Sequence, residues 1–230
     1  MQSAIVVFPG SNRERDVALA LERANGKKPI MLWHRDTELP ACDLVVLPGG
    51  FSYGDYLRCG SMASQSPIMQ AVKAFAAKGG AVLGICNGFQ ILTESGLLPG
   101  VMLQNGSLKF IAKKVRLRID QPDSPFTNHF QGHQVIQVPV AHNEGAYFAD
   151  DKTLDELEGE GRVAFRYVDA DGAATAAGNP NGAARNIAGI LSPNRRVLGM
   201  MPHPENATDL LHGGIDGLPM FTSIAESLAA

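Results

Sequence analysis

Residues 81–95 read AVLGICNGFQILTES, and in this stretch an apolar strand meets a helix without a loop. Ala81–Ile85 is a continuous apolar run, as expected of a strand buried on both faces. The turn that follows has the pattern G-x-C-x-G, a nucleophile elbow with cysteine in the place of serine. The chain must turn abruptly there, which leaves Cys86 in a strained conformation. Side chains two residues before and after Cys86 would collide in so tight a turn, and this explains Gly84 and Gly88. The pattern predicts a thiol held at a strand–helix junction of an α/β fold.

Apolar runs and helical stretches alternate on both sides of this junction. Strands are expected at Ser3–Phe8, Pro29–Trp33, Asp43–Leu47 and Ala81–Ile85, and helices at Asn12–Asn25, Ser61–Lys78 and Asn87–Ser95. Continuous apolar runs that alternate with helices indicate a parallel sheet with both faces covered.

The second half of the chain has a different pattern. Lys113–Ile119 and Val135–Val140 alternate apolar and polar residues, as half-exposed antiparallel strands do. Three more strands are expected at Arg162–Val168, Asn186–Leu191 and Arg196–Met201, a terminal helix at Pro219–Leu228, and a loop at Gly172–Arg185. The sequence therefore predicts an α/β protein. Its open, mostly parallel sheet has helices on both faces, with antiparallel strands added in the second half.

Length and composition predict one domain, residues 1–230. The 230 residues amount to about 1.5 typical domains, and no linker or repeat divides them. The 20 Lys and Arg residues against 23 Asp and Glu residues give a net charge of −3, which disfavours a nucleic-acid partner. No apolar stretch approaches the roughly 18 residues of a membrane span, and the N-terminus lacks the pattern of a signal peptide. We therefore expect no membrane partner and a cytoplasmic location.

Cysteine usage fits that location. Cys42, Cys59 and Cys86 are odd in number and have no paired spacing, so no disulfide framework is expected. The sequence contains neither C-x-x-C nor H-E-x-x-H, and no metal site is predicted.

Cys86 is the candidate nucleophile. At the N-terminus of a helix, free N–H groups and the helix dipole favour a thiolate. The N–H of Asn87 is then one donor to an oxyanion. The alternative is a buried structural cysteine whose glycines serve the turn, and we interpret Cys42 and Cys59 in that way. The glycines on both sides of Cys86 favour the nucleophile.

His203 is the candidate base, because a thiolate nucleophile needs a base and the base needs an orienting group. It follows an apolar run in the sequence MMPHPE, residues 200–205. Pro204 favours an extended His203, and in an extended chain His203 and Glu205 point to the same side. Glu205 would then accept a hydrogen bond from the ring. The alternative is a histidine that caps the end of a strand.

The other histidines have weaker claims to a catalytic role. His34 follows a strand and is expected to be solvent-exposed, and three histidines in polar stretches are expected on the surface: His129, His133 and His212. His142 follows the end of a strand, where it would line a site.

A glycine-rich loop, LPGGFSYGD at residues 47–55, follows the third apolar run. In open α/β sheets, ligands bind beyond the carboxyl ends of the strands, and a glycine there presents its N–H without a side chain in the way. Gly50 is the candidate second oxyanion donor. The loop has neither glycine-rich phosphate-binding pattern. Taken together, the residues predict a cysteine acyl-transfer enzyme whose substrate is an unspecified amide or ester.

The order and spacing of these motifs resemble those of class I, triad-type glutamine amidotransferases. Within that family, the chain is similar to the glutaminase subunits of phosphoribosylformylglycinamidine synthases, in their small separate-subunit form. The matching stretches are residues 8–12, 47–60, 84–90, 97–100, 105, 107–110, 141–142, 144–145, 203–205, 213–214, 216–217 and 221. Asn143 departs from the pattern, because a glycine is more common there. The resemblance covers essentially the whole chain and implies a flavodoxin-like fold.

The resemblance also implies a reaction. Cys86 attacks the side-chain amide of glutamine, His203 held by Glu205 moves protons, Gly50 and Asn87 hold the oxyanion, and Gln90 and His142 contact the substrate. Ammonia passes to a PurL-like synthetase subunit that works with a PurS-like small accessory subunit. ATP and magnesium are used by the synthetase, and no cofactor is implied on this chain.

Two other classes of protein carry a related cysteine elbow. Stress-type hydrolases or chaperones place the histidine next to the elbow and an acidic residue near the cysteine, whereas Asn87 follows Cys86 here. A non-catalytic binding module would not need the complete set of Cys86, His203 and Glu205. A glutaminase subunit of another amidotransferase is the remaining alternative.

Overall fold

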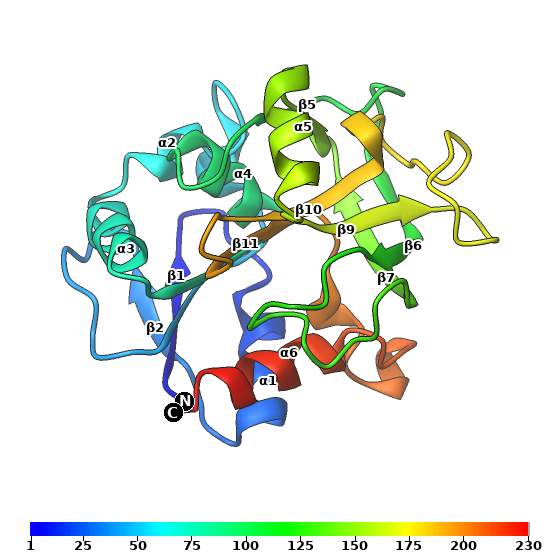
Figure 1. The fold of residues 1–230 in the computed structure, drawn as a ribbon. Coiled ribbons are helices and arrows are strands. Elements are labelled where there is room, and N and C mark those ends of the chain that lie inside the picture. Colours follow the sequence, from blue (N-terminus) through cyan, green and yellow to red (C-terminus); the bar gives the residue numbers. More distant parts are fainter. Residues whose placement is uncertain (230) are drawn as a thin grey trace.

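A nine-stranded sheet lies at the centre of residues 1–229, the part of the chain that the computed structural model describes. Figure 1 shows the arrangement. Across the sheet the strands are β2 (Ile30–Trp33), β1 (Ser3–Val7), β3 (Leu44–Leu47), β4 (Ala81–Ile85), β11 (Val197–Met200), β10 (Ile187–Leu191), β9 (Val163–Val168), β6 (Ile111–Ile119) and β7 (Val135–His142).

The sheet has a parallel part and an antiparallel part, as the sequence predicts. Strands β2, β1, β3, β4 and β11 pair parallel. From β11 onward, through β10, β9, β6 and β7, each pair is antiparallel. The alternating β6 and β7 have one half-exposed face, whereas β3 and β4 are buried throughout. Because β3, β4 and β11 are parallel neighbours, their carboxyl ends lie at one edge of the sheet.

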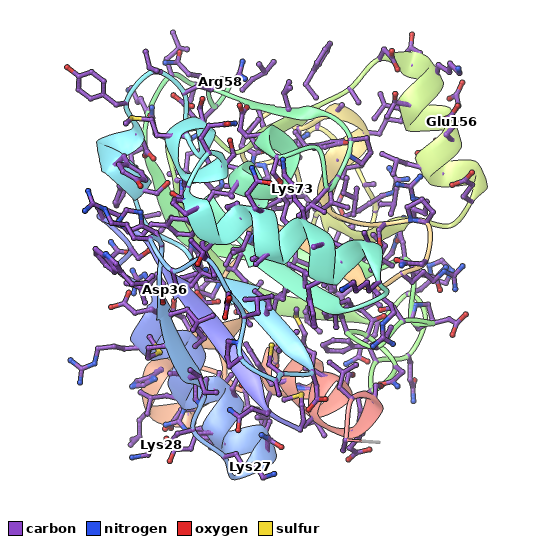
Figure 2. The ribbon with its side chains drawn as sticks, turned by 90° about the vertical axis from the view of Figure 1, so that its left-hand side faces the viewer. Lys27, Lys28, Asp36, Arg58, Lys73 and Glu156 are labelled. Carbon is purple, nitrogen blue, oxygen red and sulfur yellow. The ribbon has the colours of Figure 1, made fainter. Side chains whose placement is uncertain are left out.

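Helices cover both faces of the parallel part. On one face α1 (Glu14–Asn25) packs against α6 (Leu218–Ser227), and on the other lie α3 (Pro67–Ala77) and α4 (Asn87–Glu94) (Figure 1). Figure 2 shows α3 lying across the sheet, with Lys73 on its outer side. Its inner side buries Val72 and three further residues. The α/β architecture predicted from the alternation of elements is confirmed.

The helix predicted over Ser61–Lys78 is wrong in one respect, because it is two helices. The first, α2, spans only Ser61–Ser64, and α3 begins at Pro67. Ser66 is extended, with φ −62° and ψ 145°. A proline has no N–H for the preceding turn and disfavours helical geometry in the residue before it. Pro67 therefore starts a new helix instead of continuing the old one.

Two strands and one α-helix, together with four short turns of 3₁₀ helix, are present within residues 1–229 but were not predicted from the sequence. Two short strands, β5 (Val101–Leu103) and β8 (Ala146–Phe148), form a separate two-stranded sheet, and α5 spans Asp151–Gly159. The bounds of the other predicted elements differ from the observed bounds by no more than two residues. No helix within residues 1–229 has both the length and the apolar composition needed to cross a membrane.

Candidate active site

Cys86 lies at the junction of β4 and α4, at the carboxyl edge of the sheet. Its backbone has φ 51° and ψ −107°, a strained conformation for a residue with a side chain. A Cβ on Gly88 would come within 1.9 Å of the carbonyl oxygen of Leu47, and one on Gly84 within 2.7 Å of the backbone of Gly88. Gly88 therefore lets α4 approach β3, and Gly84 lets α4 turn back closely onto β4. The side chain of Cys86 is almost fully buried.

His203 lies just beyond the neighbouring strand, β11, and meets Glu205. Its Nδ1 is 2.6 Å from the Oε1 of Glu205, and both side chains are buried. The extended geometry predicted to bring them together is wrong, because Pro204–Asn206 is a turn of 3₁₀ helix. Proline suits the first position of such a turn, since its missing N–H would have no partner there. The predicted contact is present, but a helical turn forms it.

The charges around His203 favour its protonated form. Burial alone would lower the pKa of His203, but the negative charges of Glu205 and of a Cys86 thiolate outweigh burial and raise it. The Nε2 of His203 is buried and has no hydrogen-bond partner within residues 1–229. The ring therefore has one nitrogen held by Glu205 and one free for proton transfer beside Cys86.

Two backbone N–H groups near Cys86 are also free. Neither the N–H of Gly50 nor that of Asn87 has an acceptor among the described residues. The loop that carries Gly50 is tied to the loop after β1, where the N–H of Phe51 donates to the carbonyl of Gly10 at 2.9 Å. Gly50 has a φ of 155°, and a Cβ there would lie 2.7 Å from the carbonyl oxygen of Gly10. Only glycine fits this close approach.

Cys86, His203 and Gly50 line one cavity of about 230 Å³. The rest of its wall is formed by Asn12, Arg13, Phe51, Phe110, Ala112 and Ala141. Pockets for drug-sized ligands span roughly 300–1,000 Å³, so this cavity suits a smaller molecule, of the size of an amino acid. The structure thus brings a thiol, an imidazole and the loop of Gly50 to one cavity, with Glu205 bonded to the imidazole.

Gln90 and His142, the residues predicted to contact substrate, do not line this cavity. The side chain of Gln90 is buried and donates from Nε2 to the carbonyl of Glu144 at 2.6 Å. His142 is buried between two asparagines, with Nδ1 3.0 Å from Asn105 Oδ1 and Nε2 3.4 Å from Asn181 Nδ2. Their contact with substrate stays a prediction.

The setting of His142 keeps its ring neutral. Burial, and secondarily the positive charge of His203, lower the pKa of His142 to about 4. Asn105 and Asn181 were missed from the sequence as parts of this network, although Asn105 belongs to a stretch that carries the family resemblance. Both amides are buried, and they anchor the 143–145 loop through Gly145. The network therefore holds the 143–145 loop, which begins two residues after Ala141 of the cavity wall.

The prediction that His34 is solvent-exposed is wrong. The residue is 6% exposed, and its Nδ1 lies 2.7 Å from the hydroxyl of Tyr53, which also meets Ser66. The prediction failed because the loop at Tyr53, 19 residues further along the chain, covers the ring of His34. His129, His133 and His212 are exposed, as predicted.

The remaining cysteines lie away from the cavity. All three cysteines are free, with Cys42 half-buried and Cys59 buried. Burial raises the pKa of Cys59, and the carboxylates of Glu144 and Asp55 add to the effect, so its thiol stays protonated. Within residues 1–229, no group of three His, Cys, Asp or Glu side chains is placed to hold a metal ion.

Comparison with known proteins decides the family. The family model described as "CobB/CobQ-like glutamine amidotransferase domain" matches residues 1–215. The chain belongs to this glutamine amidotransferase family. The cavity therefore lies in an amidotransferase domain, and the alternative of a stress-type hydrolase is set aside.

Similar proteins narrow the comparison further. The amidotransferase is 60% identical over 230 residues to the protein named phosphoribosylformylglycinamidine synthase subunit PurQ of Rhodospirillum rubrum, and covers 100% of both chains. It is 59% identical over 230 residues to the protein of that name from Rhodopseudomonas palustris, covering 100% of this chain and 99% of the other. A solved structure titled "Structure of PurLQS from Thermotoga maritima" has a chain with 43% identity and a TM-score of 0.87, covering 99% of this chain and 98% of that one.

Proposed function

We propose that this chain is the glutaminase subunit of a phosphoribosylformylglycinamidine synthase and works as a single domain. The observation that carries the catalytic part is the cavity lined by Cys86, His203 and Gly50. Glu205 holds the ring of His203 from behind, and the free N–H of Asn87 follows Cys86 in the chain. The similarity to PurQ subunits along the whole chain supports the synthase to which it contributes.

The first half of the proposed reaction forms a thioester and releases ammonia. The thiolate of Cys86 attacks the side-chain amide carbon of glutamine, and the carbonyl electron pair moves to oxygen. The N–H groups of Gly50 and Asn87 stabilise this oxyanion. His203 then gives its Nε2 proton to the amide nitrogen, and the C–N bond breaks. Ammonia departs, and a glutamyl thioester remains on Cys86.

The second half restores the enzyme. Neutral His203 takes a proton from water, and the resulting hydroxide attacks the thioester carbon. The same two N–H groups stabilise the second oxyanion. The C–S bond breaks, glutamate leaves, and the thiolate of Cys86 again faces a protonated His203. Glu205 holds the ring throughout and favours its charged form.

Ammonia then reaches a synthetase partner. Free ammonia is mostly protonated at neutral pH and cannot attack, so a path shielded from solvent would keep it reactive. We assign the acceptor chemistry to a PurL-like synthetase subunit, which uses ATP and magnesium to aminate formylglycinamide ribonucleotide, with a PurS-like accessory subunit. The reduced thiol of Cys86 that the mechanism needs fits the cytoplasm, where thiols are kept reduced.

Isotope transfer tests the proposal. The chain is mixed with synthetase and accessory subunits, ATP, magnesium, formylglycinamide ribonucleotide and glutamine labelled with ¹⁵N in its side-chain amide. Excess unlabelled ammonium chloride competes for the acceptor. We expect glutamate to form and the product to carry ¹⁵N. An absence of glutamine hydrolysis would contradict the glutaminase assignment, and hydrolysis without labelled product would contradict the proposed acceptor and partners.

A further inference from the structure

The side chain of Asn87 bridges the two sides of the proposed oxyanion hole. Only 1% of the residue is exposed. Its Oδ1 accepts a hydrogen bond from the N–H of Ser52 at 3.2 Å, and its Nδ2 donates to Gln90 Oε1 at 2.8 Å and to Asp55 Oδ1 at 3.4 Å. Ser52 follows Gly50 by two residues. Asn87 therefore supplies one N–H donor from its backbone and holds the loop of the other donor with its side chain.

The orientation of this amide is fixed from both ends of a short chain of hydrogen bonds. The carbonyl of Glu144 can only accept, so the NH₂ group of Gln90 must face it at 2.6 Å. The oxygen of Gln90 then faces the NH₂ group of Asn87, which leaves the oxygen of Asn87 for the N–H of Ser52. Since a backbone N–H can only donate, an inverted amide would lose this bond.

Backbone hydrogen bonds tie the loop around Gly50 to the segment after β1, among them the one from the N–H of Tyr53 to the carbonyl of Pro9 at 2.7 Å. These bonds do not fix the distance to α4, and the loop beyond Gly50 has little regular structure of its own. Residues 52–55 form a single 3₁₀ turn interrupted by left-handed residues, with a φ of 55° at Tyr53 and 54° at Asp55. The loop also exposes its tip, where Tyr56 is 73% and Leu57 is 88% exposed. A bond from α4 into the start of this loop is placed to fix its position relative to Cys86.

We propose that Asn87 is a positioning residue that sets the separation of the two oxyanion donors, with Gln90 orienting its amide. This inference rests on the proposed glutaminase function. A donor that is misplaced by about 1 Å can cost roughly 10²-fold in rate. Because the oxyanion exists only after attack, losing this bond lowers kcat and leaves the KM for glutamine unchanged.

Kinetics of Asn87→Ala and Gln90→Met, measured as glutamate release in the complex with the synthetase and accessory subunits and ATP, test this role. We expect each variant to lose about 10²-fold in kcat with the KM of the wild-type chain. We expect the double variant to lose no more than either single variant, because both substitutions break the same connection. The matched control is Thr93→Val. It removes a buried hydrogen bond within α4, from the hydroxyl of Thr93 to the carbonyl of Gln90, and this bond does not involve the loop of Gly50. This variant should keep the wild-type kcat.

A second measurement separates positioning from general damage to the elbow. Methyl methanethiosulfonate has no carbonyl to place in an oxyanion hole, so its rate of reaction with Cys86, followed by peptide mass spectrometry, reports the thiolate alone. We expect wild-type reaction rates in Asn87→Ala and Gln90→Met.

A wild-type kcat in Asn87→Ala would overturn the inference, and so would a parallel loss of kcat and thiol reactivity. A raised KM with normal kcat in Gln90→Met would show that Gln90 binds substrate instead, and would also overturn it. A wild-type chain that releases no glutamate, alone or with its partners, would refute the proposed function itself.

Discussion

At the scale of single residues, the proposed reaction depends on the charge of the His203 ring. Glu205 contributes to the raised pKa of His203, and a charged ring is needed to protonate the leaving nitrogen. His203→Ala should lower kcat by about 10²–10⁴, and Glu205→Gln should lower it less. Glu205→Gln should also shift the alkaline limb of the kcat/KM profile to lower pH, because the ring loses its proton sooner. An unshifted alkaline limb in this variant would contradict the role of Glu205.

The buried ring of His142 leads to a prediction about how the free energy of unfolding depends on pH. The unfolded chain protonates this ring near pH 6.5, whereas the folded protein does so only near pH 4. The unfolded state therefore binds more protons between these values, and the free energy of unfolding falls as the pH drops through this window, by up to about 3 kcal/mol.

Urea unfolding between pH 4 and pH 7 checks this contribution of His142. The variant His142→Gln should lose that part of the pH dependence, and its kcat should fall far less than that of His203→Ala. A kcat as low as that of His203→Ala, with substrate binding intact, would show that the wrong histidine was chosen as the base.

At the scale of elements, the elbow depends on the fit of α4 against β3. A methyl group on Gly88 would overlap the carbonyl oxygen of Leu47, and because that oxygen belongs to the backbone it cannot move aside as a flexible side chain could. Gly88→Ala should lower the free energy of unfolding by about 3 kcal/mol or more.

The matched control is Gly159→Ala in α5, where the added methyl group meets nothing within 4 Å. This variant should be unchanged or stabilised by up to about 1 kcal/mol, as expected for alanine in a helix. Equal unfolding free energies for the two variants, from urea denaturation, would mean that the close approach at Gly88 is not needed.

The same elements show what a sequence can predict. Strands β3 and β4 are recognisable because strands buried on both faces are continuous apolar runs. Strands β5 and β8 have three residues each, which are too few to show the alternation of apolar and polar residues that marks a strand. Helix α5 was missed because its nine residues bury only Leu154 and Leu157 among charged neighbours.

The site was predicted to a similar extent. The local motifs selected Cys86, Gly50 and His203 as candidates, since each follows the end of a strand, and the structure places these three around one cavity. The predicted contact between His203 and Glu205 is also present. The burial of His34 and the hydrogen bond from the N–H of Ser52 to Asn87 depend on contacts between distant segments, and no local pattern encodes them.

At the scale of the whole molecule, the isolated chain should be a poor glutaminase. Uncoupled hydrolysis would waste glutamine, and the loop that presents Gly50 ends in an exposed tip that a partner can contact. We expect glutamate release to rise at least about tenfold with the synthetase, the accessory subunit and ATP. A single misplaced oxyanion donor costs more than that. Equal rates with and without the partners would show that the site is already complete in the isolated chain. That result would contradict this prediction but leave the glutaminase assignment in place.

The role of Cys86 is tested most directly in the assembled complex. Cys86→Ala is compared with Cys42→Ala, which changes a half-buried cysteine away from the cavity, and synthesis of formylglycinamidine ribonucleotide is measured with glutamine or with ammonium chloride as the nitrogen source. The account predicts that Cys86→Ala loses synthesis from glutamine and keeps synthesis from ammonia, and that Cys42→Ala keeps both. Synthesis from glutamine by Cys86→Ala would contradict the account.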